Sequence, residues 1–517
     1  TRRSEHSEHK IVEPIPLLTI GNKPVILNRL TSCPILSRAL RYERQKLAGM
    51  AMRIILLSVV AALLSFSLGT RAMEPDWQRL ESDSLNTLVD LIKLDTSQPA
   101  GNEYLATDYL GKRLKAEGVD FKTFEAKTGR TNIVARIKGN GSKRPLLLLG
   151  HTDVVTVEPE NWSFDPFGGT VKNGKIFGRG AADDKGIVAV SLEVLLALHR
   201  NKVPLDRDVI FLGVADEEGG GGLGITYMVE NHFEEIAAEF ALNEGGRGSI
   251  DPSTGKYVNF SIGTAEKTPR RARLLASGTA GHGSVPTRDN AIGAIARAVA
   301  RLVDTPLKME LNETTRTFFR RLAETRPEAE ASVYRDILKP NPDLATQAKL
   351  QDINPTFFSI IRTSVVPTII NGGYQRNVIP SSAGATLDIR ALPGADPEQL
   401  WEELRAIIDD DSIQIIPMKV TRPAHDPAPL QNDMFRAFED ILTKRHPGAA
   451  VLPSMLTGAT DSAQLRAAGI AAYGFGPGVV IGDNNGIHGN DEYLRVEPYF
   501  EYLRLMWLLT NQVAGSH

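Results

Sequence analysis

The sequence predicts an α/β fold with a largely parallel sheet and helices on both faces, plus a smaller inserted α+β domain. Short apolar runs such as PLLLLG and VIFLGVA alternate with helical patterns such as KGIVAVSLEVLLALHR, where Val188, Leu192 and Leu195 have helical spacing. Buried apolar strands that alternate with helices are typical of parallel sheets. Ligands bind such sheets beyond the carboxyl ends of the strands, and histidines and acids gather there in this chain.

The first domain can be followed element by element. We expect helices in LNTLVDLIKL and YLATDYLGKRLKAEG, then strands in TNIVARI, PLLLLG, VIFLGVA and FALNE. The same alternation resumes from about His425, with a helix in DMFRAFEDILTKRHPG and a strand in AAYGFGPG. The pattern therefore predicts one domain built from two parts, residues 73–265 and 421–517.

Residues 266–420 show a different order of predicted strands and helices and are expected to form the inserted domain. Strands are predicted in PRRARLLASG, ATLDIRAL and SIQIIPMKV, with helices in DNAIGAIARAVARLV and PEQLWEELRAIIDD. Within this block, residues 307–371 form a long, mostly helical pattern interrupted by several prolines.

The composition is that of a soluble globular protein of two or more domains. The 517 residues are 42% hydrophobic and 23% charged, and the formal net charge is −3. This balance gives no reason to expect nucleic acid or an anionic membrane surface as a partner.

The N-terminal region resembles targeting sequence. Residues 1–49 have no clear periodicity and are expected to be a non-structural upstream segment. Residues 50–72 have the layout of a signal peptide: Arg53, an apolar run from Ile54 to Leu68, and small residues at Thr70 and Ala72. An uncleaved membrane anchor is the less favoured alternative, because the run is short for a membrane span. We therefore expect a secreted or periplasmic protein.

Cleavage after Ala72 would leave a chain without cysteine, because the single cysteine is Cys33. Such a chain has neither disulfides nor thiol chemistry. Any bound metal must then take histidine and carboxylate ligands.

Histidines and acids follow the predicted strands or glycine turns at five places. They stand in PLLLLGHTDVV, GRGAADDKG, VIFLGVADEEGGGG, FALNEGG and GIHGNDE. Two imidazoles and several carboxylates at one sheet edge can hold two divalent cations, and a spare carboxylate beside them permits amide hydrolysis. Each place has an ordinary structural explanation alone, but the five together favour a metal site.

Two of these places carry pairs with alternative roles. His151 could be a solvated turn histidine, but Asp153 points the same way in extended chain and could accept its second ring N–H. Asp183 and Asp184 precede a helix, where capping explains one acid. A second acid there is more easily tolerated beside a cation, so both interpretations stay open.

Glu217 and Glu218 follow a predicted strand and precede four glycines. Adjacent residues in extended chain face opposite sides, so one can bind metal while the other stays free as a base. The alternative is an exposed acidic loop. Glu244 and His488 repeat the same setting before or among glycines.

The inserted domain contributes two weaker candidates. His282 lies in GTAGHGSVP between a strand and a helix, and on pattern alone it could be a surface residue. Arg390 lies on the polar face of its strand, where a solvated charge is equally compatible with the pattern. The other central histidines lack such a setting and are taken as structural: His199, His232, His425 and His446.

These motifs resemble those of the co-catalytic zinc exopeptidases, which include aminoacylase, carboxypeptidase S, glutamate carboxypeptidase and succinyl-diaminopimelate desuccinylase. The markers are HTD, GRGAADDKG, DEEGG, NEGG, GHGSVP, RNVIPSSAGATLDIR, TGATD and IHGNDE, in that order over residues 77–514. The long insertion and NEGG are most similar to carboxypeptidase S and the secreted N-fatty-acyl amino acid hydrolases.

The resemblance implies a role for each ligand position. Asp183 would bridge two Zn²⁺ ions, with Co²⁺ or Mn²⁺ as alternatives. His151 and Glu244 would complete one site, and Glu218 and His488 the other. The Asp183–Asp184 peptide is expected to be cis. Many relatives have Asp-Glu-Gly where this chain has Asn243-Glu244-Gly245, so Glu244 keeps the second acid.

The resemblance also implies catalytic and substrate-binding residues. Glu217 would be the general base, and Asp153 would orient His151. The inserted domain would act as a lid and dimerise, and His282 would reach the active site of the partner subunit in a homodimer. Residues expected to bind substrate are Asn377 and Arg390 at its carboxylate, and the backbone from Gly458 through Thr460 to Asp461.

The predicted function is metal-dependent hydrolysis of the amide bond of N-acyl amino acids or small peptides with a free C-terminal carboxylate. A second hypothesis keeps the site but makes the protein a dipeptidase or carboxypeptidase. A third makes it a secreted peptide-binding protein with structural metals. The presence of Glu217 argues against the third, because a binding module needs no free base beside two metals.

Overall fold

The structure is a computed structural model that describes residues 74–516, together with residues 35, 38, 42 and 43. The expected signal peptide at residues 50–72 and Cys33 lie outside the described residues. Among the described residues, no helix is both long and apolar enough to cross a membrane.

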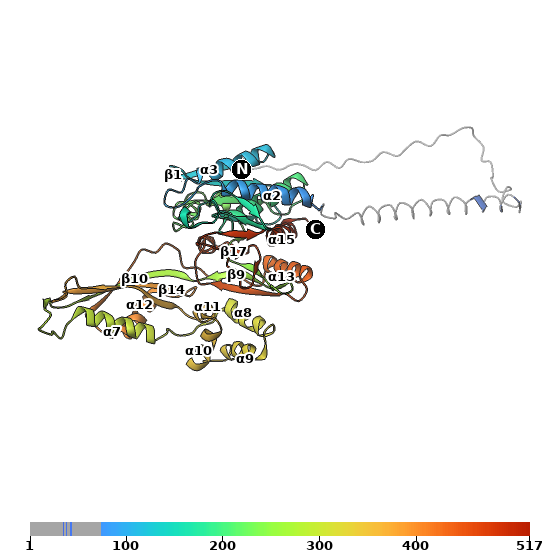
Figure 1. Cartoon of the computed structure of the whole chain (residues 1–517). Coiled ribbons are helices and arrows are strands. Elements are labelled where there is room, and N and C mark those ends of the chain that lie inside the picture. Colours follow the sequence, from blue (N-terminus) through green and yellow to red (C-terminus); the bar gives the residue numbers. More distant parts are fainter. Residues whose placement is uncertain (1–34, 36–37, 39–41, 44–73, 517) are drawn as a thin grey trace, which may run out of the picture. The chain divides into compact units, whose positions relative to one another are not determined.

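A ten-stranded sheet forms the centre of the first domain (Figure 1). Its middle strands run parallel in the order β6-β3-β7-β17, whereas β1 and β2 on one side and β9 and β8 on the other add antiparallel pairs. The fold class expected from the sequence, α/β with a largely parallel sheet, is therefore confirmed. The strands, in sheet order, are β1 (Phe121–Lys127), β2 (Arg130–Ile137), β6 (Val209–Val214), β3 (Leu146–His151), β7 (Phe240–Asn243), β17 (Ala471–Gly474), β9 (Tyr257–Glu266), β8 (Arg247–Ile250) and β18 (Val479–Val480), with β16 (Ala450–Leu456) paired to β9.

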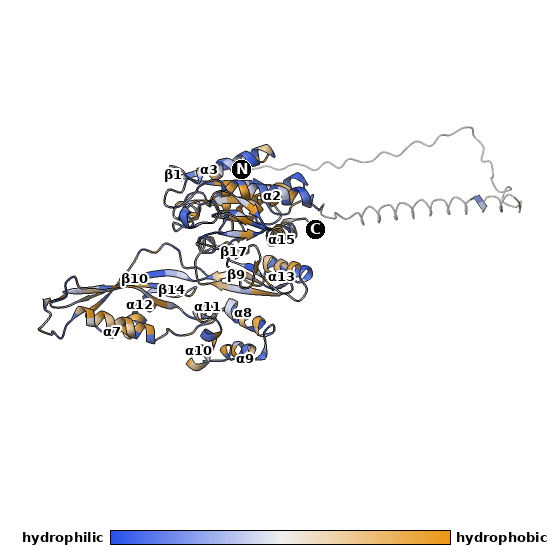
Figure 2. Cartoon of the chain, viewed as in Figure 1, coloured by the Kyte–Doolittle hydropathy of each residue, from blue (hydrophilic) through white to orange (hydrophobic). Residues whose placement is uncertain are grey.

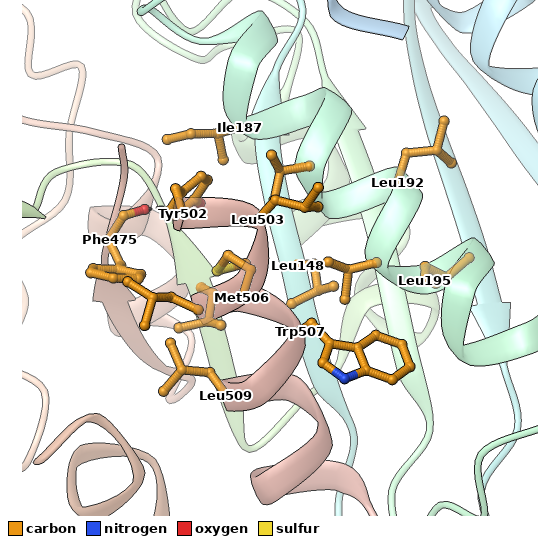
Figure 3. Close-up of a cluster of buried hydrophobic side chains, with 14 of the residues drawn as sticks. Leu148, Ile187, Leu192, Leu195, Phe475, Tyr502, Leu503, Met506, Trp507 and Leu509 are labelled. Atoms are coloured by element: carbon orange, nitrogen blue, oxygen red, sulfur yellow. Dashed lines mark hydrogen bonds between the residues drawn. The ribbon is translucent and has the colours of Figure 1, made fainter. Parts of the chain in front are cut away.

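Helices cover both faces of this sheet because side chains along each strand alternate between two cores. In β3, Leu146 and Leu148 belong to one apolar cluster, whereas Leu147 and Leu149 belong to another. The first cluster includes residues of α4 and α15, and Figure 3 shows Leu148 beside Trp507. The helices of this domain are α2 (Trp77–Ile92), α3 (Tyr104–Ala116), α4 (Lys185–Arg200), α5 (Ile225–Asn231), α6 (Phe233–Ile236), α13 (Asp433–Arg445), α14 (Ser462–Ala467) and α15 (Val496–Ala514).

A separate four-stranded antiparallel sheet is formed within residues 268–417, in the order β12-β14-β10-β15. Helices α7 and α12 pack their apolar sides against it. Figure 2 shows hydrophobic and hydrophilic residues alternating along α7, as expected for a helix with one buried face. These elements are β10 (Thr268–Ser277), α7 (Ala291–Asp304), β12 (Ser364–Gly372), β14 (Ser382–Ala391), α12 (Pro397–Ile408) and β15 (Ile413–Pro417).

The segment predicted to be mostly helical, residues 307–371, contains four helices between residues 313 and 359, and only its C-terminal end is a strand. Residues 364–372 form strand β12, which pairs with β14 along its length. The run SVVPTII is rich in β-branched residues, and Pro367 adjoins an irregularity in the register at the edge of the sheet, where proline is tolerated. The helices before it are α8 (Glu313–Ala323), α9 (Glu328–Ile337), α10 (Leu344–Ile353) and α11 (Pro355–Ser359), around their own apolar cluster.

Several short elements complete the fold and were not expected from the sequence. β11 and β13 form a two-stranded ribbon, and β4, β5 and β19 form a small third sheet. Their bounds are β4 (Thr170–Lys172), β5 (Lys175–Phe177), β11 (Gly281–His282), β13 (Val378–Ile379) and β19 (Tyr493–Arg495).

Candidate active site

The strand ends bring the predicted ligands to one edge of the large sheet. His151 is the last residue of β3, Glu217 and Glu218 follow β6, and Glu244 follows β7. β3 lies between β6 and β7, and all three run parallel, so their carboxyl ends adjoin.

Asp183 lies between the two histidines of the site. Its Oδ1 is 3.0 Å from Nε2 of His151, and its Oδ2 is 3.1 Å from Nε2 of His488. Nε2 of His488 is also 2.9 Å from Oε1 of Glu218. One carboxylate therefore faces two separate imidazoles, which is the arrangement that a bridging ligand requires.

Two groups of possible metal ligands result, and they share Asp183. His151, Asp183 and Glu244 form one group, and Asp183, Glu218 and His488 form the other. Within each group, one donor atom of every residue lies within 4.8 Å of the others. The structure thus brings together all five residues that the sequence singled out as ligands.

The Asp183–Asp184 pair does not serve as a helix cap. Asp184 occupies the N-cap position of α4 but makes no capping hydrogen bond with its side chain. Its Oδ2 instead accepts a hydrogen bond from the backbone N–H of His151 at 3.1 Å. The peptide bond between the two acids is cis, as expected. The capping interpretation is therefore wrong for this pair, and Asp184 orients the end of β3.

Asp153 organises the loop that carries the two glutamates. Its carboxylate accepts hydrogen bonds from the backbone N–H groups of Glu217 and Glu218 at 3.0 and 3.1 Å, and from Gln98 at 2.7 Å. The Nδ1 atom of His151 lies 3.0 Å from the Asp153 carbonyl oxygen and 3.5 Å from its carboxylate. Asp153 therefore fixes the His151 ring mainly through its backbone, and its carboxylate fixes the glutamate loop.

Glu217 is largely buried near the candidate ligands and has a cationic partner. Arg422 donates hydrogen bonds to the Glu217 carboxylate and to Oδ1 of Asp461, the latter at 2.7 Å. Burial, followed by the charge of Asp461, raises the pKa of Glu217 well above its ordinary value. The positive charge of Arg422 acts in the opposite direction, because it favours the ionised carboxylate of Glu217.

Nitrogen and carboxylate donors of this kind fit divalent cations such as zinc. Burial, and then the charge of Asp183, raises the pKa of Glu244 well above its usual range. Hydrogen bonds to Asp183 and Glu218 raise the pKa of His488 to about 10. The carboxylate donors therefore lie close enough to repel one another. Cations bound at the two groups would offset this repulsion in place of protons.

Metal loading is expected to release protons. His488 has a folded-state pKa raised to about 10, so at pH 7 it is protonated in the metal-free protein, whereas a metal ligand must be neutral imidazole. The apparent metal affinity should therefore rise with pH through the range from 7 towards 10. Isothermal titration of the metal-free protein in buffers with different ionisation enthalpies would count the released protons. A proton count of zero at pH 7 would contradict this assignment, and His488→Gln should release fewer protons than the unchanged protein.

Glu244, and not its neighbour, faces the ligands. Nδ2 of Asn243 donates a hydrogen bond to Oγ of Ser462 at 3.1 Å, away from the donor groups. Adjacent residues at a strand end point to opposite sides, which explains the division. The replacement of the first acid by Asn243 therefore leaves the donor set intact.

The predicted substrate-binding residues do not all lie among the ligands. His282 is exposed on β11, with its Nδ1 2.7 Å from Oγ of Ser284. Asn377 joins the same ribbon, because its carbonyl accepts a hydrogen bond from the N–H of Gly283 at 2.8 Å. Neither His282 nor Asn377 has a hydrogen bond, among the described residues, to any of the five candidate ligands.

The other candidates lie on strand β14 and in the loop before helix α14. Arg390 on β14 donates a hydrogen bond to Asp388 at 2.6 Å. Thr460 holds Glu266, the last residue of β9, through its backbone N–H at 3.0 Å and its hydroxyl at 2.9 Å. Gly458 lies in the same loop with open space around it, since a Cβ there would meet no atom within 4 Å.

Two supporting residues were missed in the sequence. Glu492 is fully buried, and its carboxylate accepts hydrogen bonds from Arg179 at 2.6 Å and from the N–H groups of Ala182 and Asp183 at 2.8 and 3.1 Å. It thereby positions the loop that carries Asp183. Arg422, the partner of Glu217, stands in a polar segment with no periodicity. Glu492 could have been suspected from its place in GIHGNDE, whereas no local signal marks Arg422.

The chain belongs to Peptidase family M20/M25/M40, whose sequence profile matches residues 147–510. Among its relatives, the probable carboxypeptidase S-like 2 of Dictyostelium discoideum is 30% identical over 369 residues, which cover 69% of each chain. The N-fatty-acyl-amino acid synthase/hydrolase PM20D1 of Homo sapiens is 30% identical over 395 residues, 73% of this chain and 76% of the relative.

Solved structures of the same family share the fold. The M20 family metallo-carboxypeptidase Sso-CP2 from Sulfolobus solfataricus superposes with a TM-score of 0.60 at 20% identity, over 83% of this chain and 99% of that one. The Bacillus subtilis YXEP protein, described as a dinuclear metal binding peptidase, gives a TM-score of 0.54 at 14% identity, over 84% of this chain and 99% of that one. The family resemblance seen in the sequence is thus confirmed.

Proposed function

We propose that this protein hydrolyses the amide bond of N-acyl amino acids or small peptides that carry a free C-terminal carboxylate. The observation that carries the proposal is the position of Asp183 between two donor groups, with the Glu217 carboxylate beside them and in neither group. One relative is named an N-fatty-acyl-amino acid synthase/hydrolase and another a probable carboxypeptidase S-like protein, and these names support the two proposed classes of substrate. Family membership supports hydrolysis over a purely binding role.

The residues divide the chemistry between them. His151, Asp183 and Glu244 would hold one cation, and Asp183, Glu218 and His488 the other. Bound cations polarise the carbonyl of a substrate and lower the pKa of water towards neutrality. The Glu217 carboxylate takes the proton of the attacking water and returns it to the leaving amine. His282 donates a hydrogen bond to the oxyanion. Asp153 and Asp184 keep His151 and the glutamate loop in place.

Zinc is the metal we propose, since the donors are imidazoles and carboxylates and zinc accepts both. Cobalt or manganese on the same ligands is the alternative. Residues 266–420 are proposed to be the lid, with Asn377 and Arg390 at the substrate carboxylate and Gly458 and Thr460 lining the pocket. Export through residues 50–72 would place the activity outside the cytoplasm.

A hydrolysis screen tests the function. Purified protein would be incubated with N-acyl amino acids of increasing chain length, with dipeptides, and with longer peptides, each in the presence and absence of a chelator. We expect chelator-sensitive release of free amino acid, and the preferred substrate class separates the acylase from the peptidase alternative. A protein that bound these compounds tightly without cleaving any of them would instead be a binding protein.

Arg422 is proposed as a positioning residue for Glu217. It joins the carboxylates of Glu217 and Asp461 while itself buried, so it holds the base at one orientation. We expect Arg422→Met to lower kcat by about 10- to 100-fold, because misplacement of a catalytic group by about 1 Å can cost about 10²-fold. KM and metal content should change little, and Arg422→Lys should restore part of kcat. A fall confined to KM would contradict this role.

A homodimer is proposed through the inserted domain. β12 is the last strand of its sheet, and Val366, Ile369 and Ile370 on it are 52%, 56% and 60% exposed. A long apolar edge strand of this kind favours pairing with another chain. Dimerisation would also explain why His282 lies exposed and without contact to the ligands of its own chain.

Mixing two inactive variants tests the action of His282 across subunits. His282→Ala and Glu217→Gln are each expected to be nearly inactive alone, since each lacks one catalytic group. Random exchange of subunits should restore roughly a quarter of normal activity, because half of the dimers then contain one complete site. Adding Ile370→Asp on the edge strand to both variants should prevent the recovery. No recovery in a mixture shown to contain heterodimers would place His282 in its own subunit's site.

A further inference from the structure

The insertion contains a cavity that is separate from the metal ligands. It has a volume of about 680 Å³ and lies between residues 306–311, the segment after α9, and α10. Ligand pockets typically measure roughly 300–1,000 Å³, so this cavity is large enough for a small molecule. Its innermost side chains are buried, namely Leu307, Gln347 and Arg362.

Arg362 in this cavity is a buried cation without an anionic partner. Only 2% of it is exposed. It donates hydrogen bonds to the Leu307 carbonyl at 3.2 Å and to the Gln347 side chain, and its guanidinium lies 3.9 Å from the ring centre of Phe358. Among the described residues, no carboxylate forms an ion pair with it, and its Nε has no hydrogen-bond partner.

A buried charge without a counter-ion is costly and needs an explanation. Burial lowers the pKa of Arg362 to about 10, which still leaves it charged at neutral pH. Six other arginines among the described residues are buried, and five of them pair with a carboxylate: Arg130, Arg179, Arg207, Arg422 and Arg466. The sixth, Arg270, donates hydrogen bonds only to the backbone carbonyls of Pro269 and Arg422. Arg362 lines the cavity, so a counter-ion from outside the described chain can reach it.

The mouth of the cavity has the same sign of charge. Lys308, Arg316 and Lys339 line it and are exposed, and only Lys339 has an ion pair among the described residues, with Asp336 at 2.6 Å. Glu310 is the single acid of the lining. The lining also includes five aliphatic side chains beside its polar residues, namely Leu307, Met309, Leu311, Leu338 and Leu344.

We propose that this cavity is a second binding site, for an amphiphile with a carboxylate head and an aliphatic chain. The carboxylate pairs with Arg362, which fits its planar geometry, and the chain lies along the leucines and Met309. A fatty carboxylate and an N-acyl amino acid share this chemistry. Binding of an N-acyl amino acid in this cavity rests on the proposed function, whereas binding of a fatty carboxylate does not.

Binding of laurate tests the site in the metal-loaded full chain that carries Glu217→Gln, which prevents turnover. Equilibrium dialysis would compare this protein with versions that also carry Arg362→Met, Arg362→Lys or the control Arg320→Met, an exposed arginine outside the cavity lining. We expect Arg362→Met to abolish one class of laurate site or weaken it at least about tenfold, as expected for loss of a charge-assisted hydrogen bond. Arg362→Lys should be intermediate and Arg320→Met unchanged.

Further ligands distinguish the chemistry of the site. N-lauroylglycine should compete with laurate if both sources of the carboxylate are bound, and failure to compete would limit the site to fatty carboxylates. Dodecanol or inorganic phosphate binding at this site as tightly as laurate would overturn the proposal, as would laurate binding unaffected by Arg362→Met.

Separate controls test whether the variants fold and whether the enzyme is active. Because Met replaces an unpaired buried charge by an apolar group, the variant is expected to fold. Should it not fold, Lys308→Glu with Arg316→Glu at the exposed mouth should still weaken laurate binding. Absence of amide hydrolysis in the unsubstituted enzyme would refute the proposed function and leave the laurate result at Arg362 intact.

Discussion

The Glu217→Gln variant is expected to keep both metal ions and to lose hydrolysis by about 10²–10⁴-fold, the usual contribution of a general base. Glutamine retains the size of the side chain but cannot take a proton from water. Glu217 belongs to neither donor group, so metal binding does not depend on it. The fold should also persist, because Arg422 keeps Asp461 as a buried partner.

The measurement combines metal analysis with steady-state kinetics on the best substrate from the hydrolysis screen. Glu218→Gln is the matched control, since it makes the same chemical change one residue away within the second donor group. That variant should lose metal as well as activity. Normal turnover by Glu217→Gln would remove Glu217 from the mechanism.

Replacement of Asp183 by alanine is expected to have the broadest effect, because its carboxylate belongs to both donor groups. Its two oxygens face different imidazoles, 3.0 Å from His151 and 3.1 Å from His488. The variant should lose both metal ions and all measurable hydrolysis. Its fold should be retained, since the contact with Glu492 uses the backbone N–H of residue 183.

His488→Ala provides the comparison for the shared ligand. It affects only the group that contains Glu218, so about one metal ion per chain should remain at His151 and Glu244. Metal content would be measured after dialysis, alongside circular dichroism to verify folding. Equal metal loss in the two variants would contradict the bridging role of Asp183.

The sequence by itself determined much of the fold and of the candidate site, because its signals are local. Apolar runs that stop at histidines or acids mark strand ends, and parallel strands must present those ends at one edge of the sheet. The five ligand positions and the free glutamate follow from that rule and from the family motifs. Helix α4 begins and ends where its pattern indicated, at Lys185 and Arg200.

Only the tertiary structure decided which groups meet across long separations in sequence. Arg422 reaches Glu217 from 205 residues away, and Glu492 reaches Asp183 from 309 residues away, because loops without periodicity fold back onto the sheet edge. Strand β12 also depends on the tertiary structure. Its residues pair with β14 although the segment before them is helical. In the sequence nothing distinguishes Arg362 from a surface arginine, and only the packing of the folded chain buries it. Local patterns specify elements and their ends, whereas burial and long-range pairing arise from the whole chain.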